Sequence, residues 1–512
     1  MSADMIALAA FVVTLLTLGG LSAKLPESLP VGKVRRRRAG RGLVLPEQYV
    51  GGVHGGVAVP KAQQSASGGN GGRQPLLMCV VALVLTAVSL AHKLSCTTLQ
   101  TGPDGVPVPW LTRVSRTGCY SDTVTLFGNR NLAAHVFPYV HSWYTTDPPA
   151  LHGGAIEYPT LTGLWAWATA LPTSSVQGFL VATAISFVPA VVVTTLCLER
   201  ISGRRAWIWA GTPPLALYGL YNWDVLPAAA TAVGLALGLG FPRGWSPTRR
   251  AVVAGAAFGV GGALKLYPLA FVAPLALAIL LDRNQADTKA RRRGACGAVG
   301  AAAAVLVVAN VPFVVANRAG WLSVFRFQAE RPIDVTTLSI WWNGARRLLG
   351  PDSSGQHLLD VAAALSTAIG VLAVLAAGTV IGLRTGAVPW VQTAAGMLCA
   401  YLLLNKVHSL QYVTWLLPFF AAVRIRTVWV VAYLLADLAA FIGWHRTNYY
   451  HSLGNPRFTW ADLALNCGVW GRAVLLAVLV VVFLRSRTVV PVQPVTQTAP
   501  EPARAEAMDV AN

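Results

Sequence analysis

Apolar runs of about twenty residues, separated by short polar turns, repeat along most of the chain. A run of that length, coiled as a helix, spans the hydrocarbon core of a bilayer. Clusters of arginine occur in alternate turns, a pattern typical of the cytoplasmic loops of membrane proteins. The clusters lie at 35–38, 204–205, 249–250, 291–293, 424–426 and 485–487. The pattern predicts an all-α polytopic membrane protein with about a dozen transmembrane helices between residues 76 and 485.

Two longer polar segments, 93–158 and 317–356, lie on the side opposite the arginines. We expect them to be extracytoplasmic loops, because the first is too polar for lipid and too long for a simple connector. Residues 1–75 combine an apolar stretch with a basic, Gly/Pro-rich segment that we expect to be disordered in the cytoplasm. The apolar stretch, 5–22, is an extra span, an uncleaved signal anchor or the product of an early start codon. The Pro-rich tail, 486–512, is also predicted to be disordered.

Two apolar regions are predicted to turn back on themselves. Residues 206–240 read as two spans that meet outside at 221–224. Residues 251–281 have cationic residues at both ends, so they must form a hairpin whose tip lies near 265–268. Such a broken helix is tolerated within a membrane only where protein or water satisfies its free backbone groups.

Composition supports a membrane protein and argues against nucleic-acid binding. The chain is 54% hydrophobic and 12% charged, whereas soluble proteins carry roughly 25% charged residues. The net charge of +20 comes from arginines in short loops, which is the topological signal already described. Of seven cysteines, Cys96 and Cys119 share the first outside loop, where a disulfide is possible but not fixed by sequence.

Ionisable residues gather at the predicted outer side of the membrane, which indicates chemistry at the outer leaflet. Asp122, beside Tyr120 in the first loop, is either a general base or a solvated residue at the start of a helix. Glu157 either binds acceptor hydroxyls or anchors the chain at the interface. Asn222 and Asp224 are explained first as turn and cap residues, although they face the same side.

Cations on that side are candidates for binding a phosphate. Lys265 lies in the middle of an apolar run, where an ammonium is costly unless it is paired or hydrated, so we favour a functional role over snorkelling. Lys406 and His408 either bind a phosphate or form a hydrophilic turn. Arg331, in the second loop, either joins them or forms a surface ion pair.

Nucleotide, dinucleotide and hydrolase motifs are absent from the sequence. It contains no P-loop, no GxSxG, no HExxH and no GxGxxG in a βαβ context. The apolar regions also show no inverted pair of broken helices, which would favour a transporter. A transporter or lipid flippase and a non-catalytic membrane scaffold nevertheless stay as alternatives of another class.

Six short segments, taken in order, resemble one enzyme family; they are YSDTVTLF…NLAAHVFPYV, EYPTLTG, YNWDVLP, GGALKLYPLAFVAPL, FQAERPIDVTTLSIWW and LLLNKVHSLQYVTWLLP. Together they resemble the actinobacterial polyprenyl-phosphate-mannose-dependent mannosyltransferases of glycosyltransferase family eighty-seven. The resemblance implies the GT-C fold and an inverting transfer of one sugar. Mannose is the expected sugar, and arabinofuranose is the alternative. The expected partners are a polyprenyl-phosphate sugar donor and a lipid-anchored glycan acceptor at the cell membrane.

The resemblance also implies roles for the candidate residues. Asp122 matches the general base of the family's first outside loop. The expected phosphate-binding residues are Lys265, Lys406, His408 and Arg331; the expected sugar- or acceptor-binding residues are Glu157, Tyr120, Asn222 and Asp224. Some GT-C enzymes have a paired-acid motif that needs a metal ion. Because no second acid stands beside Asp122, we expect neither a metal nor another cofactor.

Overall fold

The computed structural model describes residues 73–102, 105–147, 149–346, 353–455 and 457–490. The predictions for the stretch 5–22, for the basic segment up to residue 72 and for the tail beyond residue 490 lie outside the described residues.

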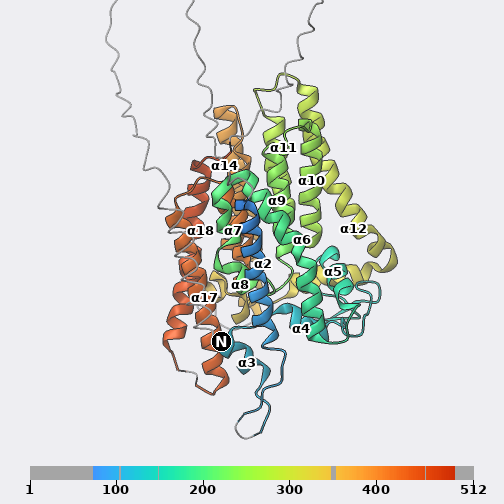
Figure 1. The fold of residues 1–512 in the computed structure, drawn as a ribbon, viewed down its shortest axis with the longest axis vertical. Helices are drawn as coiled ribbons and strands as arrows, with labels where there is room; N and C mark the ends of the chain where they lie inside the picture. The colour runs from blue at the N-terminus through green and yellow to red at the C-terminus, as the bar shows by residue number, and fades with distance from the viewer. Residues whose placement is uncertain (1–72, 103–104, 148, 347–352, 456, 491–512) are drawn as a thin grey trace, which may run out of the picture.

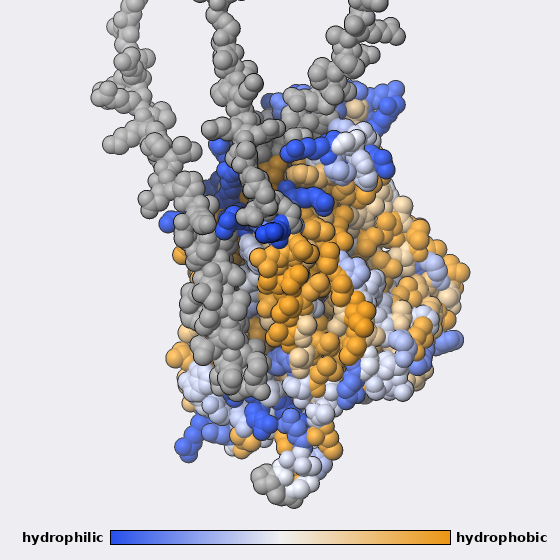
Figure 2. All heavy atoms as spheres, viewed as in Figure 1, coloured by the Kyte–Doolittle hydropathy of each residue, from blue (hydrophilic) through white to orange (hydrophobic). Residues whose placement is uncertain are grey.

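The described chain is a helical bundle, as the hydrophobic pattern predicts (Figure 1). Six helical segments are long and apolar enough to cross a membrane; they are α2 (Arg73–Leu94), α6 with α7 (Val176–Ser202, Trp207–Ala210), α12 (Thr288–Glu330), α14 (Ser353–Thr385), α17 (Thr427–Ser452) and α18 (Trp460–Arg485). Hydrophobic residues cross the middle of the face in Figure 2, and hydrophilic residues lie toward both ends. The chain is therefore a polytopic membrane protein.

The remaining predicted spans are shorter helices, so the expected dozen becomes six long and four short apolar helices among the described residues. The short ones include α9 (Val225–Gly238), α15 (Trp390–Leu404), α11 (Val272–Leu280, preceded by a 3₁₀ turn at Tyr267–Phe271) and α16 (Val413–Ala422, preceded by a 3₁₀ turn at Leu410–Tyr412). Every residue of α16 is buried. A helix that is apolar on all sides belongs in the interior of a bundle, where its length need not match the bilayer.

The chain turns at both predicted places, although the first of the two spans expected in 206–240 is replaced by the short helices α7 and α8 (Pro213–Tyr218). The chain turns between α8 and α9, at the expected residues 221–224. Helix α10 (Pro247–Leu264) ends directly before Lys265, and the chain returns through α11. Helix α10 packs closely on α12 because both present small residues: a β-carbon at Gly255 would overlap the carbonyl of Ala298.

The first predicted outside loop is a folded cap at one end of the bundle. It contains α3 (Trp110–Thr117), α4 (Asp122–Asn129) and the antiparallel strands β1 (Trp143–Thr146) and β2 (Pro149–His152), and it leads into α5 (Thr160–Ala170). A disulfide joins Cys96 to Cys119, which decides the pairing that the sequence left open.

The second predicted outside loop begins later than expected. Helix α12 continues to Glu330, with a kink at Asn317 whose backbone leaves the helical region. The Asn317 side-chain amide donates to the carbonyls of Val140 and Ser142, and its oxygen accepts from the amide of Gly320. These bonds replace the helical ones lost at the kink and fasten α12 to the cap. The loop proper therefore starts at Arg331.

Candidate functional site

Asp122 is the first residue of α4 and is held against the turn between α8 and α9. Its backbone amide donates to the carbonyl of Tyr221 at 2.8 Å. The hydroxyl of the preceding Ser121 donates to the carbonyls of Leu220 and Tyr221, at 2.6 and 3.2 Å. These bonds fix the Asp122 carboxylate beside a turn that is distant in sequence, while its side chain stays half-buried.

Two tyrosines donate to the Asp122 carboxylate, one to each oxygen. The Tyr120 hydroxyl lies 2.9 Å from Oδ1 and the Tyr158 hydroxyl lies 2.7 Å from Oδ2. The charge of Asp122, and then burial, raise the pKa of Tyr120 above its ordinary value. Burial, and then the charge of Asp122, raise the pKa of Tyr158. Both phenols therefore stay protonated and keep donating, which orients the carboxylate and leaves its remaining lone pairs free to accept a proton.

Lys265 stands at the tip of the α10–α11 hairpin and pairs with Asp224. Its Nζ atom lies 2.5 Å from Asp224 Oδ1, and the two side chains are 14% and 2% exposed. Burial raises the pKa of Asp224, and the charge of Lys265 opposes that effect. Asp224 Oδ2 has no hydrogen-bond partner among the described residues.

Three aromatic rings surround the Lys265 ammonium. Its Nζ atom lies 5.2 Å from the ring centroid of Tyr158, 5.0 Å from that of Tyr412 and 5.0 Å from that of Trp415. Ring faces stabilise a cation without neutralising it. Lys265 is therefore only partly matched by Asp224 and keeps free N–H donors for a ligand with negative charge.

Tyr158 connects the two charged groups and is the residue that the sequence reasoning missed. Its hydroxyl donates to Asp122, and its ring lies beside the Lys265 ammonium. Asn222 Nδ2 lies 3.5 Å from the same hydroxyl, and Asn222 Oδ1 accepts from the amide of Asp224. The available signal was its position in the segment EYPTLTG, directly after Glu157.

The structure thus brings together five of the predicted residues, namely Asp122, Tyr120, Asn222, Asp224 and Lys265. We call this group, with Tyr158, the Asp122–Lys265 site. It joins a carboxylate that accepts protons to a half-buried cation, through one shared tyrosine.

Glu157 lies next to this site, but its carboxylate is engaged elsewhere. It forms an ion pair with Arg130, at the end of α4, and both side chains are half-buried. The Glu157 carbonyl accepts from Gln328 Nε2 of α12 at 2.7 Å. Glu157 therefore fastens α4 to the chain that carries Tyr158.

Arg331 and Lys406 meet at the end of α12, at the edge of the site. Lys406 Nζ donates to the carbonyls of Ala329 and Arg331 at 2.9 and 2.8 Å, and it lies 3.6 Å from a carboxylate oxygen of Asp360. Burial lowers the pKa of Lys406, and Asp360 opposes that effect. Arg331 donates to Thr336 Oγ1 at 3.1 Å, and its charge acts on the hydroxyls of two tyrosines of the site region, Tyr221 and Tyr412. Lys406 caps α12, whereas the Arg331 side chain bonds to Thr336 in the turn that follows.

His408 belongs to a different polar cluster. It is 5% exposed, and its Nε2 atom lies 3.4 Å from the Tyr433 hydroxyl. Burial, and then the charge of Arg472, lower the pKa of His408 well below its ordinary value. The His408 ring therefore contacts Tyr433 of α17 in the interior of the bundle and joins no residue of the Asp122–Lys265 site in the hydrogen bonds of the described residues.

That cluster corrects the expectation that ionisable groups lie almost entirely at the predicted outer side. Asp437 of α17 and Arg472 of α18 form a buried ion pair at 3.3 Å inside predicted spans. Tyr218 donates to Asp437 at 2.7 Å, and Arg472 donates to the carbonyl of Leu338 at 3.4 Å. Single charges within apolar runs were the signal that should have identified them.

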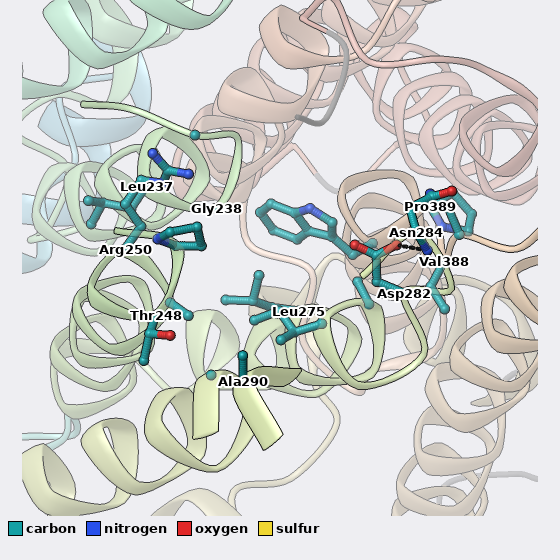
Figure 3. A pocket seen from close by; sticks show the side chains of 18 of the residues that line it. Leu237, Gly238, Thr248, Arg250, Leu275, Asp282, Asn284, Ala290, Val388 and Pro389 are labelled. Carbon is teal, nitrogen blue, oxygen red and sulfur yellow. Dashed lines mark hydrogen bonds between the residues drawn. The ribbon is translucent and has the colours of Figure 1, made fainter. Parts of the chain in front are cut away.

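A cavity of about 220 Å³ lies at the other end of α10 (Figure 3). The residues that line it include Pro247, at the start of this 18-residue helix, whereas Lys265 follows the end of the helix. A helix of that length spans about 27 Å. Arg250 donates to backbone carbonyls beside the cavity, and Asp282 Oδ1 accepts from the amide of Asn284. Arg250 and Asp282 are thus bonded to backbone groups, and no two charged side chains of this lining form an ion pair in the described chain, so the Asp122–Lys265 site is the stronger candidate functional site.

No protein-family model and no curated protein matches this chain. Its function must therefore be argued from the site. A metal site of three or more His, Cys, Asp or Glu side chains does not occur among the described residues. The charged groups that the site offers are the oriented carboxylate of Asp122 and the half-buried ammonium of Lys265.

Proposed function

We propose that the protein is an inverting glycosyltransferase of the GT-C type. It moves one sugar, mannose in the first instance, from a polyprenyl phosphate to a glycolipid or cell-envelope glycan at the outer leaflet. The observation that carries the proposal is the joining of an oriented carboxylate, Asp122, to a half-buried cation, Lys265, through Tyr158. This arrangement suits a reaction that needs one base and one anion-binding group.

In the proposed reaction an acceptor hydroxyl oxygen attacks the anomeric carbon of the donor. The new bond forms as the bond from that carbon to the phosphate oxygen breaks, and the electron pair leaves with the polyprenyl phosphate. Asp122 takes the proton of the acceptor hydroxyl. Lys265 and Arg331 stabilise the negative charge of the departing phosphate.

A phosphate is already a good leaving group, so the reaction needs no general acid. Glycosidases, in contrast, use two carboxylates with separate roles. One base that activates the acceptor for in-line attack inverts the anomeric carbon. A β-linked lipid donor would therefore give an α-linked product.

The test is a transfer assay with the purified protein in lipid nanodiscs. The donors are polyprenyl-phosphate mannose and polyprenyl-phosphate arabinofuranose, offered separately with mixed membrane glycolipids, and mass spectrometry detects the products. We expect mannose to be transferred and the Asp122→Asn variant to be inactive but folded. The matched control is Asp147→Asn, since Asp147 is an exposed aspartate of the same cap. Normal turnover by Asp122→Asn would refute the proposal.

A lipid or sugar transporter is the second candidate, and the buried Asp437–Arg472 pair favours it. Ionisable groups inside a membrane often mark the path of a transported ion or substrate. Cysteines placed at positions 122, 224, 265 and 408 distinguish the two functions. Labelling from the outer side alone is expected for the transferase, whereas labelling of any of them from the cytoplasm would favour transport.

A further inference from the structure

The cavity at the far end of α10 (Figure 3) takes no part in the proposed reaction, and five helices begin or end around it. The residues that line it come from the ends of α9 and α11 and from the starts of α10, α12 and α15. The starts of α10 and α12 carry the arginine clusters at 249–250 and 291–293, which the positive-inside rule assigns to the cytoplasm. The cavity therefore belongs to the cytoplasmic end of the bundle, where lipid headgroups meet the protein.

The lining of this cavity changes from polar to apolar with depth. Asn284 is exposed and Asp282 is half-buried, whereas Leu275, Ile279 and Trp390 are buried. The volume of about 220 Å³ exceeds that of an apolar cavity of roughly 150 Å³, which is large enough to bind benzene. The cavity therefore suits an amphiphile whose apolar chain lies inside and whose polar group stays near the exposed side.

Arg250 gives the cavity wall a buried positive charge. Its hydrogen bonds within the described chain all come from NH1, which donates to three backbone carbonyls; the shortest bond, to Trp245, is 2.9 Å. No carboxylate of the described residues forms an ion pair with Arg250. A guanidinium carries five N–H donors, so those on Nε and NH2 are available to a phosphate group.

Basic residues dominate the two segments that lead into α10 and α12 beside the cavity. The basic residues of 241–250 and 282–293 are Arg243, Arg249, Arg250, Arg283, Lys289, Arg291, Arg292 and Arg293, and the acids are Asp282 and Asp287. Asp282 lines the cavity, and its Oδ1 atom accepts from the Asn284 amide at 3.0 Å. Basic pockets between membrane helices on the cytoplasmic side bind anionic lipid headgroups. The charge around the cavity thus favours an anionic lipid over a neutral one.

We propose that this cavity is a binding site for one anionic phospholipid of the cytoplasmic leaflet. The lipid phosphate accepts hydrogen bonds from Arg250, and part of one acyl chain lies against Leu275, Ile279 and Trp390. The proposal goes beyond the glycosyltransferase function and does not depend on it. A lipid held here connects the ends of five helices, and a ligand that binds only the folded state stabilises that state.

The test is photochemical labelling of the full-length protein in nanodiscs of neutral phosphatidylcholine. The probes are phosphatidylglycerol and phosphatidylcholine with the same diazirine-bearing acyl chain, offered separately, and peptide mass spectrometry locates the attached lipid. The variant Ala278→Phe adds a benzene-sized ring to the lining. Its matched control is Ala273→Phe, at an exposed position of α11 outside the lining. Thermal unfolding checks each variant, and Ala290→Phe, also in the lining, is the substitute if Ala278→Phe does not fold.

We expect phosphatidylglycerol to label the lining residues of α11 and of the segment 387–392. Phosphatidylcholine should label them about fivefold less, because its choline cation cancels the phosphate charge that attracts the basic residues. Ala278→Phe should remove this labelling, whereas Ala273→Phe should retain it. Equal labelling by the two lipids overturns the proposal, and so does undiminished labelling of a folded Ala278→Phe variant.

Arg250→Gln tests the contact with the phosphate. Labelling by phosphatidylglycerol should fall about tenfold, since a hydrogen bond between charged groups is lost. The matched control is Arg200→Gln, because Arg200 is an exposed arginine at the end of α6 on the same expected side of the membrane. Unchanged labelling in a folded Arg250→Gln variant would overturn the phosphate contact and, with it, the proposed site. Neither labelling experiment requires sugar transfer, so failure of the transfer assay would leave the lipid site standing.

Discussion

Two buried pairs of opposite charge differ in their access to ligand. Asp437 and Arg472 lie between α17 and α18, with side chains 4% and 0% exposed. Asp224 and Lys265 lie at the hairpin tip, where the lysine is 14% exposed and Asp224 Oδ2 has no partner among the described residues. The first pair is further bonded by Tyr218 and by the carbonyl of Leu338.

The difference teaches that burial of a charge does not by itself indicate a functional site. The Asp437–Arg472 pair lies between two helices and is closed to solvent, so its removal chiefly affects stability. The Asp224–Lys265 pair has a half-buried cation and a carboxylate oxygen without a hydrogen-bond partner among the described residues, so a ligand can complete it. A third pair, Arg130 and Glu157, is more exposed than either and links the cap to the site. The variants described next test whether each of the three ion pairs contributes mainly to stability or mainly to sugar transfer.

The largest effect on stability is expected for Arg472→Met. This change leaves Asp437 as an unpaired buried acid and should lower the free energy of unfolding by about 3–5 kcal/mol. The double variant Arg472→Met/Asp437→Leu should recover most of that loss, as thermal unfolding in detergent would show. A single variant as stable as the native protein would contradict a structural role for the pair.

Lys265→Met should reduce transfer more than it reduces stability. We expect about a 100-fold loss in kcat/KM for the donor, because a group that stabilises the leaving phosphate is removed. The double variant Lys265→Met/Asp224→Asn should regain stability without regaining transfer, unlike the double variant of the other pair. An unchanged donor KM, with normal turnover, would exclude Lys265 from the phosphate site.

Tyr158→Phe tests the connection between base and cation. It removes the hydrogen bond to Asp122 Oδ2 and keeps the ring beside Lys265. A hydrogen bond to a charged group contributes about 1.5–3 kcal/mol, so kcat should fall by about tenfold or more while the donor KM stays near native. Tyr120→Phe is the matched comparison at Oδ1. Equal activity of Tyr158→Phe and the native protein would remove Tyr158 from the site.

The smallest effect is expected for Glu157→Gln. The pair with Arg130 is partly exposed, and such pairs contribute about 0–1 kcal/mol. Unfolding should therefore change little. If Glu157 binds the acceptor, as we predicted, the acceptor KM should rise while the donor KM stays constant; a rise in both would indicate that the variant disturbs Tyr158 instead.

The sequence by itself determined that the chain is helical and lies in a membrane. Length and hydropathy suffice for this, because a bilayer requires long apolar helices whatever their packing. Sequence also located the turn at 221–224 and the hairpin tip at Lys265, since loop charges fix where an apolar run must reverse. For Asp122, Asn222, Asp224 and Lys265, the sequence predicted a common side of the membrane but no contacts between the side chains.

Tertiary structure alone decided which of these charges meet. Tyr158 joins Asp122 to Lys265, Lys406 caps α12, and His408 faces Tyr433 instead of the site. Asp437 forms an ion pair with Arg472 across α17 and α18. Hydropathy reports how deep a residue lies along a span, whereas electrostatic pairing depends on helix rotation and neighbours, which only the packed bundle fixes.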